Sequence, residues 1–162
     1  MPHPIAKKDF PVSNVRHFLE PGPIVLVSSQ WQQHTNIMTM GWHMVMAFSP
    51  SLLGCVIDAG NHSHALVCNS GECVINIPSA SLVDKVVGIG NCSGSEIDKF
   101  KAFELTPGKS EKVGAPRIEE CYASFECRLH DDAMIERYNL FIFEVVKAHA
   151  APSADEEESL HY

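Results

Sequence analysis

The chain has 162 residues, 45% of them apolar and 20% charged, which is ordinary for a globular protein that buries one hydrophobic core. Its formal net charge is −8, and the sequence contains no basic patch interleaved with aromatic residues, so nucleic acid is not expected as a partner. We therefore expect a single domain over residues 1–162.

The sequence shows no sign of export or of membrane insertion. Residues 1–10 contain two lysines but no apolar segment of the kind that a secretory signal needs, so a cytoplasmic protein is expected. The longest apolar stretch, 42–57, is interrupted by His43 and Ser49-Pro50-Ser51, so no membrane span is expected. The six cysteines contain no C-x-x-C pair, which favours buried, reduced thiols over disulfides or structural zinc. The acidic run 155–158 predicts a solvated tail or loop.

Six segments have the length and the β-branched or aromatic content of strands. They span residues 24–29, 36–48, 52–58, 72–78, 123–129 and 140–148. The first follows the turn signal Pro21-Gly22-Pro23, and residues 30–35 predict a loop or hairpin end. Because the strands are too closely spaced for repeated parallel crossovers, we expect a mainly antiparallel barrel.

Short helices are predicted between these strands. Asn61 or Ser63 is suited to cap a helix that ends at Ser70-Gly71, and Ser79 to cap a second helix. Residues 96–103 predict a third helix. Loops or irregular segments are expected over residues 1–22, 88–94 and 106–116.

The segment Asn36 to His43 mixes polar, small and aromatic residues where a plain core strand would be apolar. Trp42 in isolation would be interpreted as a core aromatic residue. Beside Asn36, Thr39 and Gly41 it is more typical of a wall or floor for a flat ring.

Residues Asn61-His62-Ser63-His64 follow the third predicted strand and open a predicted helix. Unpaired N–H groups at a helix N-terminus favour phosphate, although simple capping with exposed histidines explains the same residues equally well. A metal clip fits less well, because His62 and His64 would share one side of a strand but not of a helix. Together with the Asn36 to His43 segment, this turn suits a planar ligand that carries a phosphate, which we interpret as flavin mononucleotide (FMN).

A glycine cluster and a lysine complete the candidate site. Gly88, Gly90 and Gly94 are spaced G-x-G-x-x-x-G and follow a predicted helix, unlike the dinucleotide fingerprint G-x-G-x-x-G, which follows a strand. A mobile loop near a ligand is expected there instead. Lys99 by itself would be a solvated surface lysine, whereas near a flavin its ammonium would contact phosphate or stabilise the anionic reduced ring.

Five ordered blocks carry a resemblance to a known family. They are residues 36–42, 61–64, 71–78, 85–94 and 98–100. In these blocks the chain resembles the flavin reductase-like, FMN-binding split-barrel family, and it is most similar to the flavoredoxin branch. The match covers about Pro21 to His149.

The resemblance implies a mainly β fold, a six-stranded antiparallel Greek-key split barrel with a few short helices, assembled as a homodimer with FMN near each subunit boundary. Residues 36–42 would line the isoalloxazine with backbone help from 55–57, while 61–64 and Lys99 would hold the ribityl-phosphate end. The implied FMN-binding residues are Asn36, Met38, Thr39, Met40, Gly41, Trp42, Cys55, Val56, Ile57, Asn61, His62, Ser63, His64 and Lys99. No catalytic side chain or metal ligand is assigned, because the chemistry would belong to the cofactor.

Three functions remain open at this point. The leading hypothesis is an NAD(P)H-dependent flavin reductase, with hydride transfer to flavin N5. The alternative is a flavoredoxin-type electron carrier that keeps its FMN, lacks a useful NAD(P)H site and docks to a basic redox partner protein. A third is a binding module for another ligand, such as haem. The chain stops at Leu160-His161-Tyr162, where relatives carry a further segment, so a looser dimer or a more open flavin edge is expected.

Overall fold

The computed structural model describes residues 22–161 and, before them, residues 4, 6, 7 and 9–11. The irregular segment expected over residues 1–22 therefore falls largely outside the described residues. Among the residues described, no helix is long and apolar enough to cross a membrane.

Seven strands form one antiparallel sheet in the order β2-β1-β5-β8-β9-β4-β3. Their bounds are β1 Val25–Trp31, β2 His34–Met40, β3 His43–Ala47, β4 Leu52–Val56, β5 Glu72–Ile77, β8 Ala123–Asp131 and β9 Leu140–Ala150. The two edge strands, β2 and β3, are consecutive in the chain and are joined only by Gly41 and Trp42. The sheet therefore curls until its edges meet, as in an open barrel, and this confirms the predicted fold class.

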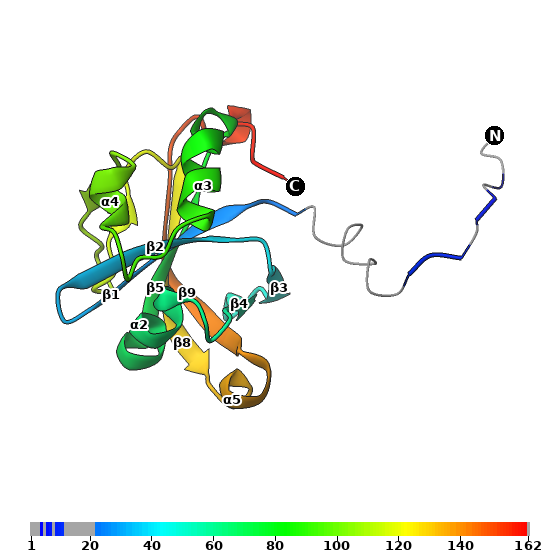
Figure 1. Ribbon diagram of the computed structural model, residues 1–162, viewed down its shortest axis with the longest axis horizontal. Coiled ribbons are helices and arrows are strands. Elements are labelled where there is room, and N and C mark those ends of the chain that lie inside the picture. The colour runs from blue at the N-terminus through cyan, green and yellow to red at the C-terminus, as the bar shows by residue number, and fades with distance from the viewer. Residues whose placement is uncertain (1–3, 5, 8, 12–21, 162) are drawn as a thin grey trace.

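The remaining elements are short. A second, two-stranded sheet pairs β6 Pro107–Gly108 with β7 Arg117–Ile118. The α-helices are α2 His62–Ser70, α3 Val83–Gly90, α4 Lys99–Ala102 and α5 Ile135–Tyr138, with 3₁₀ turns η2 Ala80–Leu82 and η3 Ala154–Glu156. Helix α2 packs on β1 and β2, and α3 and α4 pack on β2. Figure 1 shows α3 and the C-terminal segment at one end of the sheet, and α2 and α5 at the other.

Strand β1 shows why the core has two parts. Val25 and Val27 point into the barrel with Phe141 and Phe143, whereas Leu26 points to the opposite face, under α3 and α4. Side chains alternate across a strand, so a run that is apolar at every position is buried on both faces.

Several predicted boundaries were wrong in detail. The predicted strand 36–48 is two strands, since the chain turns at Gly41 and Trp42, and this division explains seven strands where six were expected. Loop 30–35 shrinks to Gln32-Gln33, both with positive φ (49° and 70°), between paired strands. Gly88 and Gly90 lie inside α3, so the expected loop begins only at Asn91.

The helix predicted over 96–103 is a single turn, Lys99–Ala102, capped by Asp98. Ser79 makes no side-chain capping bond and precedes a 3₁₀ turn rather than an α-helix. The expected loop 106–116 contains β6. In the acidic run, Glu156, Glu157 and Glu158 are exposed as expected, but the backbone after them is docked, because Leu160 O accepts from Ile24 N at 2.6 Å.

All six cysteines are free thiols. Cys55, Cys73 and Cys127 are buried, as expected, and Cys92 and Cys121 are half-buried, but Cys68 is exposed, against the expectation. Burial raises the pKa of Cys55 to about 12.

A fully buried carboxylate, Glu126 on β8, fixes the loop before β7. Its Oε1 accepts from the backbone N–H of Lys112 at 2.6 Å, and its Oε2 accepts from the N–H of Glu111 at 3.1 Å and from His149 Nε2 at 2.5 Å. Burial by itself raises the pKa of this carboxyl, but the bonds from His149 and the backbone outweigh burial and hold the pKa below its ordinary value.

We predict that Glu126→Gln lowers the free energy of unfolding at neutral pH by about 2–4 kcal/mol, because His149 and the buried N–H donors lose their charged acceptor. The folded pKa is depressed, so this contribution is present above the unfolded value of 4.5 and is lost as the pH falls through the folded pKa. Urea denaturation at neutral pH and at about pH 3.5 measures the difference in the free energy of unfolding between the wild type and Glu126→Gln. This difference should be smaller at the acidic pH. Glu96→Gln, at an exposed position, is the control. The prediction would be contradicted if Glu126→Gln lowered the free energy of unfolding no more than the control does, or if its effect did not depend on pH.

Candidate functional site

The junction of β2 and β3 opens a cavity of about 190 Å³. Its lining residues are Met38, Thr39, Met40, Gly41, Trp42, Val56, Asp58 and Asn61. Because Gly41 and Trp42 leave the sheet to connect its two edges, the indole of Trp42 stays 54% exposed beside the cavity rather than entering the core. A wall of methionine, threonine and tryptophan with a few polar groups suits a flat, partly polar ring.

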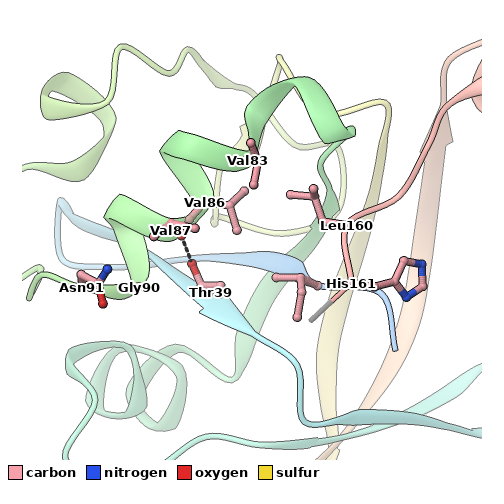
Figure 2. A pocket seen from close by; sticks show the side chains of 9 residues that line it. Thr39, Val83, Val86, Val87, Gly90, Asn91, Leu160 and His161 are labelled. Carbon is pink, nitrogen blue, oxygen red and sulfur yellow. Dashed lines mark hydrogen bonds between the residues drawn. The ribbon is translucent and has the colours of Figure 1, made fainter. Parts of the chain in front are cut away.

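Thr39 separates this cavity from a second one of about 330 Å³. Its Oγ1 donates to the carbonyl of Val86 at 2.7 Å, which ties β2 to α3. Figure 2 shows Thr39 beneath α3, with Val83, Val86 and Val87 on one side and Leu160 and His161 on the other. The second cavity is therefore mainly apolar, and it shares the lining residue Thr39 with the first.

The turn after β4 positions the N-terminus of α2. Asn61 is extended (φ −81°, ψ 134°) and its side chain accepts from the N–H of Ser63 at 2.9 Å, so it is the N-cap. Gly71 ends the helix with φ 67°, which glycine adopts without strain. The predicted helix and its cap are confirmed.

A buried hydrogen bond joins this helix to β2. Asn36 Nδ2 donates to Ser63 Oγ at 2.9 Å, and both side chains are buried. Asn36 is only 2% exposed, and its Oδ1 has no partner among the residues that the structure describes. A buried acceptor without a donor is unfavourable by about 1–3 kcal/mol, so this atom is suited to a ligand hydroxyl.

A third cavity, of about 120 Å³, lies between the α2 turn and the loop after α3. Its lining residues are Asn36, Gly60, Asn61, His62, Cys92, Ser93, Gly94 and Lys99. Asn61 lines both this cavity and the one beside Trp42, so the two are adjacent. The loop approaches so closely that a Cβ at Gly94 would lie 2.0 Å from Asn36 Oδ1.

Lys99 supplies a buried positive charge to the third cavity. Only 5% exposed, it donates from Nζ to the carbonyl of Ile89 at 2.9 Å, and no carboxylate within the described ranges pairs with it. Burial lowers the pKa of Lys99. A buried ammonium with one neutral acceptor favours an anion, and the solvated position that Lys99 would have as an ordinary surface lysine is ruled out.

Most of the residues expected to bind a ligand therefore gather at two adjacent cavities, but four do not line them. Cys55 and Ile57 are buried in the barrel core, which leaves only their backbone available. His64 lies edge-on to Phe141, with ring centroids 5.3 Å apart, and bonds Asn139. Ser63 lines neither cavity, and its hydroxyl contacts Asn36, which lines the third cavity.

The sequence reasoning missed five lining residues: Asp58, Gly60, Cys92, Ser93 and Gly94. Asp58-Ala59-Gly60 precedes Asn61, and Gly60 N donates to Asp58 Oδ1 at 2.8 Å, an Asx turn that an Asp two residues before a Gly favours. The glycine-containing loop 88–94 was expected near a ligand, but the contacts of Cys92, Ser93 and Gly94 depend on tertiary packing.

Comparisons with known proteins identify the family of the chain. The profile of the family described as "Flavin reductase like domain" matches residues 16–162. The chain belongs to this family. It is 32% identical to an uncharacterized protein of Archaeoglobus fulgidus over 152 residues, which are 93% of this chain and 85% of that one.

Solved structures show the same fold. Flavoredoxin from Methanosarcina acetivorans superposes with a TM-score of 0.80 and 25% identity, over 91% of this chain and 77% of that one. The FMN-binding protein from Thermus thermophilus also gives a TM-score of 0.80, with 22% identity over 99% of this chain and 91% of that one.

Proposed function

We propose that this member of the flavin reductase-like family binds FMN across the two cavities that meet at Asn61. The proposal rests on the buried ammonium of Lys99, which lies beside the first turn of α2 and pairs with no carboxylate among the described residues. A phosphate there would accept from Lys99, and the partial positive charge at the N-terminus of α2 would favour it.

The remaining parts of FMN also match the residues present. Ribityl hydroxyls would donate to the unpaired Oδ1 of Asn36, and the flat ring would lie against Thr39, Met40 and Trp42. Polar residues predominate in the cavity of about 120 Å³, and methionine, valine and tryptophan line the cavity of about 190 Å³, which matches the polar phosphate end and the flat ring of the cofactor.

We predict that Lys99→Met weakens FMN binding about tenfold to a hundredfold, because one charge-assisted bond to phosphate is lost. Riboflavin, which has no phosphate, should bind both proteins almost equally. Quenching of flavin fluorescence measures both affinities, and the exposed Lys101→Met is the matched control. Equal losses for FMN and riboflavin would show that Lys99 acts on the fold rather than on the phosphate.

We further propose that the chain is an NAD(P)H-dependent flavin reductase. Bound FMN would supply N5 as the hydride acceptor. The apolar cavity at Thr39 supports this proposal, since Val86, Val87 and Leu160 offer an apolar surface for a nicotinamide beside the ring cavity. Burial there would exclude water from the side of the site that faces α3.

An electron carrier of the flavoredoxin type is the second candidate. The likeness to the flavoredoxin of Methanosarcina acetivorans favours it, and a net charge of −8 suits a basic partner protein. It would retain FMN and gain electrons from a protein rather than from a pyridine nucleotide.

The two functions differ in one anaerobic measurement. We predict that NADH or NADPH bleaches the flavin absorption of the FMN-loaded protein within seconds to minutes. Val87→Arg, which places a charge in the apolar cavity, should slow bleaching without changing FMN affinity. Retained colour with both nucleotides, combined with normal FMN affinity, would exclude the reductase and leave the carrier.

We also propose that the chain forms a homodimer through β3. This edge strand and the residue after it expose apolar side chains, with Val45 66% and Phe48 92% exposed. Such an edge is open to pairing with another chain, and a second copy would cover it close to Trp42.

Phe48→Asp is predicted to convert a dimer into a monomer, because the charge would be buried at the interface while the chain itself loses little packing. Light scattering after gel filtration measures the mass. Met134→Asp, at another exposed apolar position, should leave the dimer intact. A wild-type protein that is monomeric at micromolar concentration would refute the assembly.

A further inference from the structure

Three side chains outside the proposed flavin site form a line at the end of the sheet where α2 and α5 lie (Figure 1). Cys68 Sγ is 3.7 Å from His64 Nδ1, one helical turn away on α2. His64 Nε2 is 3.2 Å from Oδ1 of Asn139, the residue that ends α5. The sequence shows only His64 and Cys68 at i, i+4 spacing, because Asn139 is 75 positions from His64.

The hydrogen bond to Asn139 decides which nitrogen of His64 is free. An amide oxygen only accepts, so Nε2 carries the proton and donates, and Nδ1 is left with its lone pair toward Cys68. Phe141 contacts the imidazole edge-on at 84°, which restricts rotation of the ring. The arrangement is a nucleophile, a base and a residue that orients the base.

Among the cysteines, Cys68 alone is exposed. Burial raises the pKa of the thiols of Cys55 and Cys121 to about 12. A hydrogen bond with Cys127, together with burial, raises the pKa of Cys73 well above its ordinary value, so these three thiols stay protonated. Partial burial also raises the pKa of Cys68, so this thiol needs a base in order to react at neutral pH.

We propose that Cys68 is a site of reversible S-thiolation by low-molecular-weight disulfides, with His64 as its base and Asn139 as a positioning residue. The imidazole Nδ1 takes the proton of Cys68 as Sγ attacks one sulfur of the disulfide. A new S–S bond forms, the old one breaks, and its electron pair leaves on the other sulfur. That thiolate takes the proton from the imidazolium and departs as a thiol. Cys68 is oxidised and the small disulfide is reduced.

This site does not depend on the proposed flavin function. His64 and Cys68 lie on α2 but do not line the two cavities that share Asn61, the N-cap of this helix. The modification would add a bulky group to the exposed side of α2, the helix whose first turn contributes to those cavities.

The test incubates the full-length, reduced protein with glutathione disulfide and follows modification of each cysteine by mass spectrometry. At pH 7, Cys68 should be modified fastest. His64→Gln should slow it on the order of tenfold to a hundredfold, the range of general base catalysis at its lower end. Asn139→Gly, which tolerates the positive φ of 55° but has no side-chain acceptor, should also slow it, whereas Asn139→Asp keeps an acceptor and should restore it. His161→Gln is the control, because this imidazole bonds Ser159 rather than a cysteine.

A second pH separates a base from a structural residue. At about pH 10, hydroxide ionises far more of the thiol without help, so the wild-type and His64→Gln rates should converge. Equal rates at pH 7 would overturn the proposal and leave simple exposure as the cause. A deficit in His64→Gln that persists unchanged at pH 10 would also overturn it, because His64 would then act only on the packing around Phe141.

Discussion

The hydrogen bond from Asn36 to Ser63 is the contact on which the candidate site depends. It joins β2, which lines the cavity beside Trp42, to the first turn of α2, which lines the cavity beside Lys99. Both partners are buried, so water does not replace the bond readily if one is lost. The two residues are 27 positions apart in the sequence, and the β3–β4 hairpin lies between them in the chain.

Two buried charges show how differently the fold treats ionised groups. Glu126 is satisfied from within, by backbone donors and His149, and so it contributes to stability. Lys99 has one neutral carbonyl and an adjoining cavity. A buried charge that has few partners and borders a cavity is typical of a binding site. By this criterion Glu126 is a structural residue and Lys99 is a candidate ligand contact.

Much of the fold could be predicted because local patterns and tertiary packing agree. The apolar run from Val25 is buried on both faces, and Asn61 caps a helix where the sequence places one. Prediction failed where packing overrides local preference. Nothing local divides 36–48 at Gly41, since the division exists only because the sheet curls until its edges meet. For Lys99, the flanking residues alone predict a solvated lysine, so only the family resemblance assigned it to the ligand site, and the packing of α4 is what buries it. The line from Cys68 to Asn139 was equally invisible, because it joins distant segments.

Asn61 both caps α2 and lines two cavities. Occupancy of the cavities and fraying of that helix are therefore thermodynamically linked, since a molecule that binds only the capped form raises the free energy needed to open the first turn. The rate of amide hydrogen exchange at Ser63 and its neighbours would then report the fraction of the protein with an occupied site, even for a compound without a visible absorption.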